Sequence, residues 1–186
     1  MAAAGFNVLG VEIVPWVAEE YKHEVILADV SYLDSSKFKD YDVIVGSPPC
    51  RDFSIIDRSF GHKWKRPPDP EGEGMRLVEV FLNFVKVAEP RFWLMENVPG
   101  LAKYIGPPKA HPTLGQGMTR YFWGEFPRFL IPRDMNKKLI QVKKKSNYPR
   151  KKALFERSRI PFPCAYSFAK ACADLIQDDP SEYPEV

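Results

Sequence analysis

The sequence predicts an α/β fold with a doubly wound, mostly parallel sheet. Three observations favour this class. Four short apolar runs are nearly continuous, which is typical of strands covered on both faces of a parallel sheet. Helical patterns separate some of the runs, as alternating β and α elements require. Each run also has a polar or acidic residue at or next to its end, at the edge where open α/β sheets bind ligands.

The expected elements follow in chain order. Strands are expected at residues 8–13, 25–30, 41–47 and 91–97. Helices are expected at 15–21, where proline occupies a favoured first position, at 73–88 and at 164–177. The last two helices carry apolar side chains at helical spacing. These are Leu77, Phe81, Val85 and Ala88 in one helix, and Phe168, Cys172, Leu175 and Ile176 in the other.

Two stretches rich in proline and glycine, 54–73 and 106–117, are too long for ordinary connections. Structureless loops of this length are usually functional or disordered. After the second stretch, TRYFWG at 119–124 is expected to form a strand, alone or paired with RFLIP at 128–132. The tail after the last helix is expected to fray.

The composition of the 186 residues, 45% of them apolar, fits one globular domain. No signal-peptide pattern is present, and no apolar run reaches the roughly 20 residues of a membrane span, so we expect a soluble, cytoplasmic protein. The three cysteines, Cys50, Cys164 and Cys172, lack zinc-site spacing and are odd in number. We therefore expect free thiols and no metal, with the last two cysteines in a helix core.

Charge is distributed unevenly along the chain. The net charge is only +3, yet residues 133–159 hold eleven Lys or Arg against two acidic residues. A basic segment of this kind indicates a phosphate-bearing partner such as nucleic acid, although a solvated surface is the alternative.

The residues at the strand ends, Glu12, Asp29, Cys50 and Glu96, are expected to converge on one crevice. Carboxylates in such positions commonly hold the ribose hydroxyls or the adenine amine of a nucleoside cofactor. The alternative for Glu12 and Asp29 is that they cap the helices that follow.

Two motifs at these strand ends carry a resemblance to a known family. The sequence has Pro48-Pro49-Cys50 after one strand and Glu96-Asn97-Val98 at the end of the next, and so resembles the cytosine C5 methyltransferases. Four further stretches are similar to other motifs of that family: GFNVLGVEIVPWVAEEY (5–21), ILADV (26–30), QGMTRYFWG (116–124) and IPFPCAY (160–166). The resemblance implies a Rossmann-like class I methyltransferase fold, S-adenosyl-L-methionine as cofactor and DNA as partner, as in restriction-modification.

The resemblance also implies a role for each matching residue. Cys50 would be the nucleophile, Glu96 would hydrogen-bond the cytosine ring, and Arg120 would reach the base oxygen at position 2. The expected cofactor-binding residues are Glu12, Ile13, Asp29, Val30 and Pro48, and the expected substrate-binding residues are Ser54, Asn97, Lys143, Lys144 and Lys145. The chain would divide into a catalytic domain (1–125), a basic nucleic-acid-facing segment (126–159), a helix packing back on the catalytic domain (160–179) and a tail (180–186).

The chemistry explains why these residue types are needed. A thiolate that adds to carbon 6 of cytosine converts the ring to an enamine, which can attack a methyl sulfonium from carbon 5. Arg51, next to Cys50 at a helix start, is expected to favour the thiolate. Burial is expected to keep Glu96 partly protonated, so that it can stabilise the charge developing on the ring. The target base must be flipped out or single-stranded, with basic side chains holding the phosphates.

The sequence also departs from the family pattern. The family's first motif, a strand with a glycine-rich loop, would precede Gly5, so the expected sheet lacks its first strand. Either the start lies further upstream or the chain is a truncated relative. Arg51 and Met118 replace a usual glutamine and arginine, and residues 124–158 are short for a target-recognition region. A catalytically silent nucleic-acid binder and a tRNA methyltransferase therefore stay open as alternatives, and the oligomeric state is not predicted.

Overall fold

The computed structural model describes residues 1–54, 69–114, 118–130 and 160–178. The chain divides into two compact units. The larger unit comprises Asn7–His111 and Arg120–Phe126, and the smaller comprises Met1–Phe6, Pro112–Thr119 and Pro127–Val186. All predicted strand ends belong to the larger unit.

The larger unit begins with a parallel pair of strands, β1 (Leu9–Glu12) and β2 (Glu24–Leu27), with Glu12 opposite Leu27. The helix α1 (Pro15–Ala18) connects them and starts at its proline, whose missing amide costs no helical hydrogen bond there. A single-turn 3-10 helix, η2 (Val30–Tyr32), follows β2, and a second, η3 (Ser35–Phe38), precedes the next strand.

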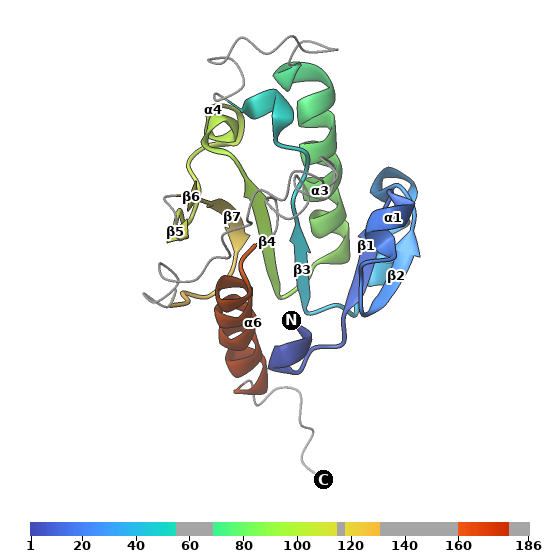
Figure 1. Cartoon of the computed structure of the whole chain (residues 1–186), viewed down its shortest axis with the longest axis vertical. Coiled ribbons are helices and arrows are strands. Elements are labelled where there is room, and N and C mark those ends of the chain that lie inside the picture. Colours follow the sequence, from blue (N-terminus) through green and yellow to red (C-terminus); the bar gives the residue numbers. More distant parts are fainter. Residues whose placement is uncertain (55–68, 115–117, 131–159, 179–186) are drawn as a thin grey trace, which may run out of the picture. The chain divides into compact units, whose positions relative to one another are not determined.

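A three-stranded sheet forms the second part of this unit (Figure 1). Its central strand β4 (Phe92–Asn97) pairs in parallel with β3 (Val43–Gly46) and antiparallel with β7 (Tyr121–Glu125). The longest helix of the unit, α3 (Met75–Ala88), connects β3 to β4 and runs beside both strands in Figure 1.

The face of α3 toward the sheet builds the core. Val78, Phe81 and Val85 are buried together with Met95 of β4 and Trp123 of β7. Burying side chains of this size contributes about 1.5–3 kcal/mol each. This core fixes β4 between its neighbours, and so fixes the residues at the ends of β3 and β4.

Short elements complete the described chain. In the larger unit these are η4 (Arg51–Phe53), the π-helical turn η5 (Pro70–Gly74), η6 (Pro99–Leu101) and α4 (Ala102–Ile105). In the smaller unit they are η1 (Ala2–Ala4), the antiparallel strands β5 (Thr113–Leu114) and β6 (Met118–Thr119), and α6 (Phe162–Gln177). No helix in the described ranges is long and apolar enough to cross a membrane.

The mixed α/β class and the parallel pairing of successive strands are confirmed. The described strands, however, form separate sheets, with β1–β2 in one and β3–β4–β7 in another. Two of these strands are not fully covered on both faces, because Leu27 of β2 and Val45 of β3 are about half exposed. Burial in this structure therefore does not explain why these two positions are apolar.

The helices also differ in detail from expectation. The buried stripe of α3 runs through Val78 and Phe84 rather than Leu77, which is only half-buried. In α6, Cys164, Phe168 and Cys172 are buried as expected, but Leu175 is exposed. Adjacent apolar residues make such a face ambiguous, because a one-residue step turns the helix by about 100°.

Two predicted loops contain regular structure. Residues 70–74 form η5, and the stretch predicted as a loop at 106–117 contains β5 and a bridge between Ala110 and Phe122. The strand predicted in TRYFWG is confirmed as β7, but its partner is β4 rather than RFLIP, of which residues 128–130 are described and form no strand.

Candidate active site

The predicted nucleophile lies in a short turn after β3. The strand ends at Gly46, and Pro48 and Pro49 follow, which cannot donate to a sheet ladder. Cys50 is exposed and is the N-terminal cap residue of η4, and its carbonyl oxygen accepts a hydrogen bond from the amide of Phe53 at 3.2 Å. Phe53 is buried in the core of the larger unit, and this burial anchors the turn.

The end of β4 is joined to this turn by a side chain. Asn97 is buried, and its Nδ2 donates a hydrogen bond to the carbonyl oxygen of Pro48 at 3.0 Å. Its Oδ1 accepts from the amide of Val98 at 2.9 Å. The two sequence motifs are therefore in direct contact, and Asn97 is the residue that joins them.

A glycine keeps the same two segments close. A Cβ on Gly100 would lie 2.0 Å from the carbonyl oxygen of Phe53, much closer than any real contact. Gly100 belongs to η6, two residues after the motif at 96–98, so the backbone of η4 packs directly on η6. The turn that carries Cys50 is thus held both by a hydrogen bond and by close packing.

Glu96 and Arg120 form an ion pair beside this turn. Arg120 Nη1 lies 3.0 Å from Glu96 Oε1, and the two side chains are only 16% and 10% exposed. The antiparallel register of β4 and β7 brings the pair together, because Glu96 lies opposite Phe122. The distance in sequence, 24 residues, is spanned by this strand pairing.

The carboxylates of Glu12 and Asp29 lie at the ends of the neighbouring strands β1 and β2. The amide of Ala28 donates to the carbonyl oxygen of Glu12 at 3.0 Å, which keeps the strand ends together. Glu12 Oε1 accepts from the amide of Val14, and Asp29 Oδ1 accepts from the amide of Ser31, both at 2.8 Å. Asp29 therefore caps η2, as the alternative interpretation expected.

The electrostatics of Asp29 favour the ionised form. Hydrogen bonds from the backbone amide and the hydroxyl of Ser31 lower the pKa of Asp29, and the charge of Arg76 adds a smaller effect in the same direction. An anionic carboxylate accepts hydrogen bonds from hydroxyl and amino groups, and so could bind the ribose or adenine of a nucleoside.

For the other predicted site residues, the structure shows little beyond the exposure of their side chains. Ile13 is exposed, Val30 and Ser54 are half-buried, and the amide of Ser54 donates to Arg51 within η4. Lys143, Lys144 and Lys145 lie outside the described residues. The roles assigned to all the site residues stay predictions.

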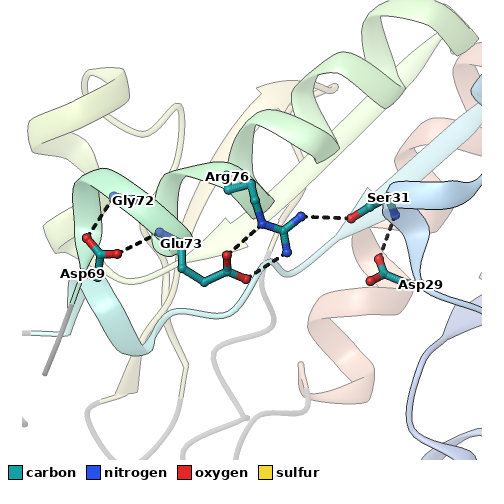
Figure 2. Close-up of polar contacts among 6 residues, drawn as sticks. All are labelled: Asp29, Ser31, Asp69, Gly72, Glu73 and Arg76. Carbon is teal, nitrogen blue, oxygen red and sulfur yellow. Dashed lines mark hydrogen bonds and ion pairs between the residues drawn. The ribbon is translucent and has the colours of Figure 1, made fainter. Parts of the chain in front are cut away.

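Sequence reasoning missed a set of polar contacts that connects Ser31, after β2, with α3 and η5 (Figure 2). Arg76 of α3 bonds Glu73 and also Ser31, and Asp69 caps η5 through the amides of Gly72 and Glu73. The Asp69-Pro70 pair is a recognisable start signal for a helix. The contact between Arg76 and Ser31 has no such signal.

Three groups of the larger unit carry side chains capable of chemistry: an exposed thiol in a rigid turn, a nearly buried carboxylate with its guanidinium partner, and two carboxylates that accept hydrogen bonds. Comparisons with known proteins give a family match for part of the chain. Residues 1–105 match the model of the family described as "C-5 cytosine-specific DNA methylase".

Similar curated proteins include "Type II methyltransferase M1.HphI" of Haemophilus parahaemolyticus, which is 33% identical over 53% of this chain and 28% of its own length. "Type II methyltransferase M.NgoFVII" of Neisseria gonorrhoeae is 32% identical over 52% of this chain and 27% of its own length. "Type II methyltransferase M.DdeI" of Desulfomicrobium norvegicum is 34% identical over 53% of this chain and 24% of its own length. The match spans about a quarter of the length of each of these relatives.

Proposed function

The chain belongs to the family of C-5 cytosine-specific DNA methylases, and from that premise we propose that it transfers a methyl group from S-adenosyl-L-methionine to carbon 5 of cytosine in DNA. The observation that carries the proposal is the hydrogen bond from Asn97 to Pro48, which joins the turn of Cys50 to the strand of Glu96. Several relatives that match about half of the chain are named as type II methyltransferases.

In the proposed reaction, the Cys50 thiolate adds to carbon 6 of the cytosine ring, and carbon 5 becomes nucleophilic. Glu96 in its protonated form donates to ring nitrogen 3 and accepts from the exocyclic amine through its other oxygen, and Arg120 donates to the oxygen at position 2. The cofactor, when bound, would supply the methyl group from its sulfonium centre, with a neutral thioether as the leaving group. Once carbon 5 is methylated, a base from solvent takes the proton from carbon 5, the bond between carbon 6 and sulfur breaks, and Cys50 leaves as the thiolate with which the reaction began, which regenerates the aromatic ring.

The residues at the ends of β1 and β2 fit the nucleoside part of this cofactor. Glu12 and Asp29 come from adjacent strands, and both accept hydrogen bonds. We propose that they bind the ribose hydroxyls and the adenine amine, with Ile13, Val30 and Pro48 lining the site. Ser54, Asn97 and the lysines at 143–145 would face the nucleic acid.

We also propose that the two sheets of the larger unit are parts of one doubly wound sheet of the Rossmann-like class I methyltransferase kind. The parallel pairs β1–β2 and β3–β4, each with a helical connection, support this arrangement. In the described ranges, β1 and β3 each have one edge with no strand partner. We further propose that the chain divides into the catalytic domain (1–125), the basic segment (126–159), the C-terminal helix (160–179) and the tail (180–186).

Covalent trapping tests the proposed function. A duplex oligonucleotide containing 5-fluorocytosine, incubated with the protein and S-adenosyl-L-methionine, is expected to give an adduct, because fluorine at carbon 5 cannot leave as the proton does. Cys50→Ser should abolish the adduct, and the matched control Cys164→Ser should retain it. No adduct with the wild-type chain would contradict the proposal, and an adduct with tRNA but not DNA would replace the substrate.

A further inference from the structure

A continuous set of hydrogen bonds connects the turn after β2 to the first turn of α3. Asp29 accepts from the amide of Ser31, and the hydroxyl oxygen of Ser31 lies 3.3 Å from Arg76 Nη1, which donates to it. Arg76 also binds Glu73 in a bidentate manner, with Nε and Nη2 each 2.8 Å from a carboxylate oxygen (Figure 2). One guanidinium therefore holds three oxygen atoms from two segments.

The same set continues to the turn that carries Cys50. The amides of Gly72 and Glu73 donate to Asp69 at 3.0 and 3.2 Å. The amide of Asp69 in turn donates to Oδ1 of Asp52 at 3.0 Å. Asp52 is buried, belongs to η4 and lies two residues after Cys50. Polar contacts among described residues thus extend from Asp29 to the Cys50 turn.

We propose that Arg76 is a positioning residue that couples the nucleoside turn at Asp29 to the turn of Cys50. This inference rests on the proposed function and deepens it: occupation of the Asp29 site and the order of the Cys50 turn are energetically linked. The planar guanidinium suits this task, because its fixed fork holds Glu73 while another N–H reaches Ser31.

The position of Arg76 supports a coupling role over a role in global stability. The side chains of Arg76 and Glu73 are 48% and 45% exposed, and exposed ion pairs contribute little to folding. The two sheets have no ladder between them in the described ranges, so contacts from α3 contribute to their relative position. The bond between Arg76 of α3 and Ser31 of η2 joins residues 45 positions apart in the sequence.

Hydrogen exchange of the protein without ligand tests the link directly. In Arg76→Gln, we expect amides of residues 29–33 and 50–54 to exchange about two- to fivefold faster, which corresponds to the measured range for exposed ion pairs. Lys86→Gln is the matched control, because it removes one positive charge from an exposed position at the other end of α3. Unchanged exchange in both segments of Arg76→Gln would overturn the proposal.

A conservative variant separates bridging from charge. Arg76→Lys keeps the positive charge near Asp29 but lacks the fork that holds Glu73 and Ser31 together. We expect Arg76→Lys to exchange like Arg76→Gln, with the melting temperature of both within the range of Lys86→Gln. Full recovery of wild-type exchange by lysine would show that charge alone acts and would overturn the bridging role.

Two measurements with S-adenosyl-L-methionine distinguish this inference from the proposed function. Calorimetric titration shows whether the wild type binds the cofactor, and hydrogen exchange at saturating cofactor tests the coupling. In the wild type, saturating cofactor should slow exchange at 50–54, and Arg76→Gln should lose most of that effect, since coupling between sites is reciprocal. Equal slowing in both proteins would overturn the coupling and leave the function intact. A wild type that binds no cofactor would contradict the proposed function, while the ligand-free exchange would still decide the role of Arg76.

Discussion

Asn97 at the end of β4 donates a hydrogen bond to the backbone carbonyl of Pro48 after β3, over 3.0 Å. Because Asn97 is buried and its oxygen is also bonded, to the amide of Val98, both of its polar groups are satisfied inside the protein. The carboxyl ends of two parallel strands are thereby fixed to each other. The exposed thiol of Cys50 depends on this fixation for its position.

Replacing Asn97 should therefore change both the free energy of unfolding and the position of the Cys50 thiol. We expect Asn97→Ala to lower the free energy of unfolding by about 1–3 kcal/mol, because it leaves the carbonyl of Pro48 and the amide of Val98 without their partner. Urea unfolding measures this loss. Asn83→Ala, at an exposed position of α3, is the control and should change stability by no more than about 0.5 kcal/mol. Equal stability of the two variants would contradict a structural role for the Asn97 bonds.

Removing one partner of the ion pair between Arg120 and Glu96 should destabilise the protein far more than removing one partner of a surface pair. Arg120→Ala leaves a nearly buried carboxylate without this partner, and we expect a loss of about 3 kcal/mol in unfolding free energy. Lys39 and Glu89 form the control pair, at 3.9 Å with side chains 56% and 75% exposed, so Lys39→Ala should cost less than about 1 kcal/mol.

Salt provides a second check on these two pairs. Raising the ionic strength should remove the effect of Lys39→Ala but leave most of the effect of Arg120→Ala, because exposed charges are screened more than buried ones. Similar losses for the two variants at all salt concentrations would mean that the burial of Glu96 has no energetic consequence.

The sequence patterns located the strands within a few residues, and local features explain why. Prolines after β3 end that strand, and the polar residues Glu96 and Asn97 mark the end of β4. The bond between Asn97 and Pro48 places the motifs at two of the strand ends in contact. The convergence of Glu12 and Asp29 with Cys50 and Glu96 on one crevice stays a prediction. The resemblance, rather than periodicity, identified Arg120 as a site residue, but its ion pair with Glu96 was not predicted.

Other features could not be obtained from local patterns. The contact between Arg76 and Ser31 depends on how α3 approaches the end of β2, and no spacing rule relates residues 45 positions apart. The pairing of β7 with β4 likewise depends on competition among strands. The face of α3 was misplaced from Val78 to Leu77 because two apolar residues are adjacent in the sequence.

Gly100 should not tolerate a side chain, because the backbone of Phe53 packs directly against it. Gly100→Ala would place a Cβ 2.0 Å from the carbonyl oxygen of Phe53, so the backbone of η4 must shift. We expect a loss of about 1–3 kcal/mol in unfolding free energy and a changed alkylation rate of Cys50. Gly5→Ala is a useful contrast, since its φ of +93° is strained but no atom lies within 4 Å. It should lower stability by about 1 kcal/mol without altering Cys50.

The buried thiol of Cys172 should make stability depend on pH in the alkaline range. Burial raises the pKa of Cys172 from 9.0 to about 12, so the folded protein holds the neutral thiol where the unfolded chain ionises. The unfolded state therefore binds fewer protons between these pH values, and the free energy of unfolding falls as pH rises. Below pH 9 both states are protonated, and the stabilising effect of the neutral thiol is fully present.

Comparison of the wild type with Cys172→Ala isolates this effect, because the other groups that titrate above pH 9 are common to both proteins. We expect the stability advantage of the wild type, measured by urea unfolding, to be constant below pH 9 and to shrink steadily toward pH 12. Alkylation at pH 9 should modify exposed Cys50 first, because a thiol with a pKa near 12 is ionised in only about one part in a thousand. A constant advantage, together with rapid alkylation of Cys172 in the native protein, would mean that α6 does not hold this thiol away from water.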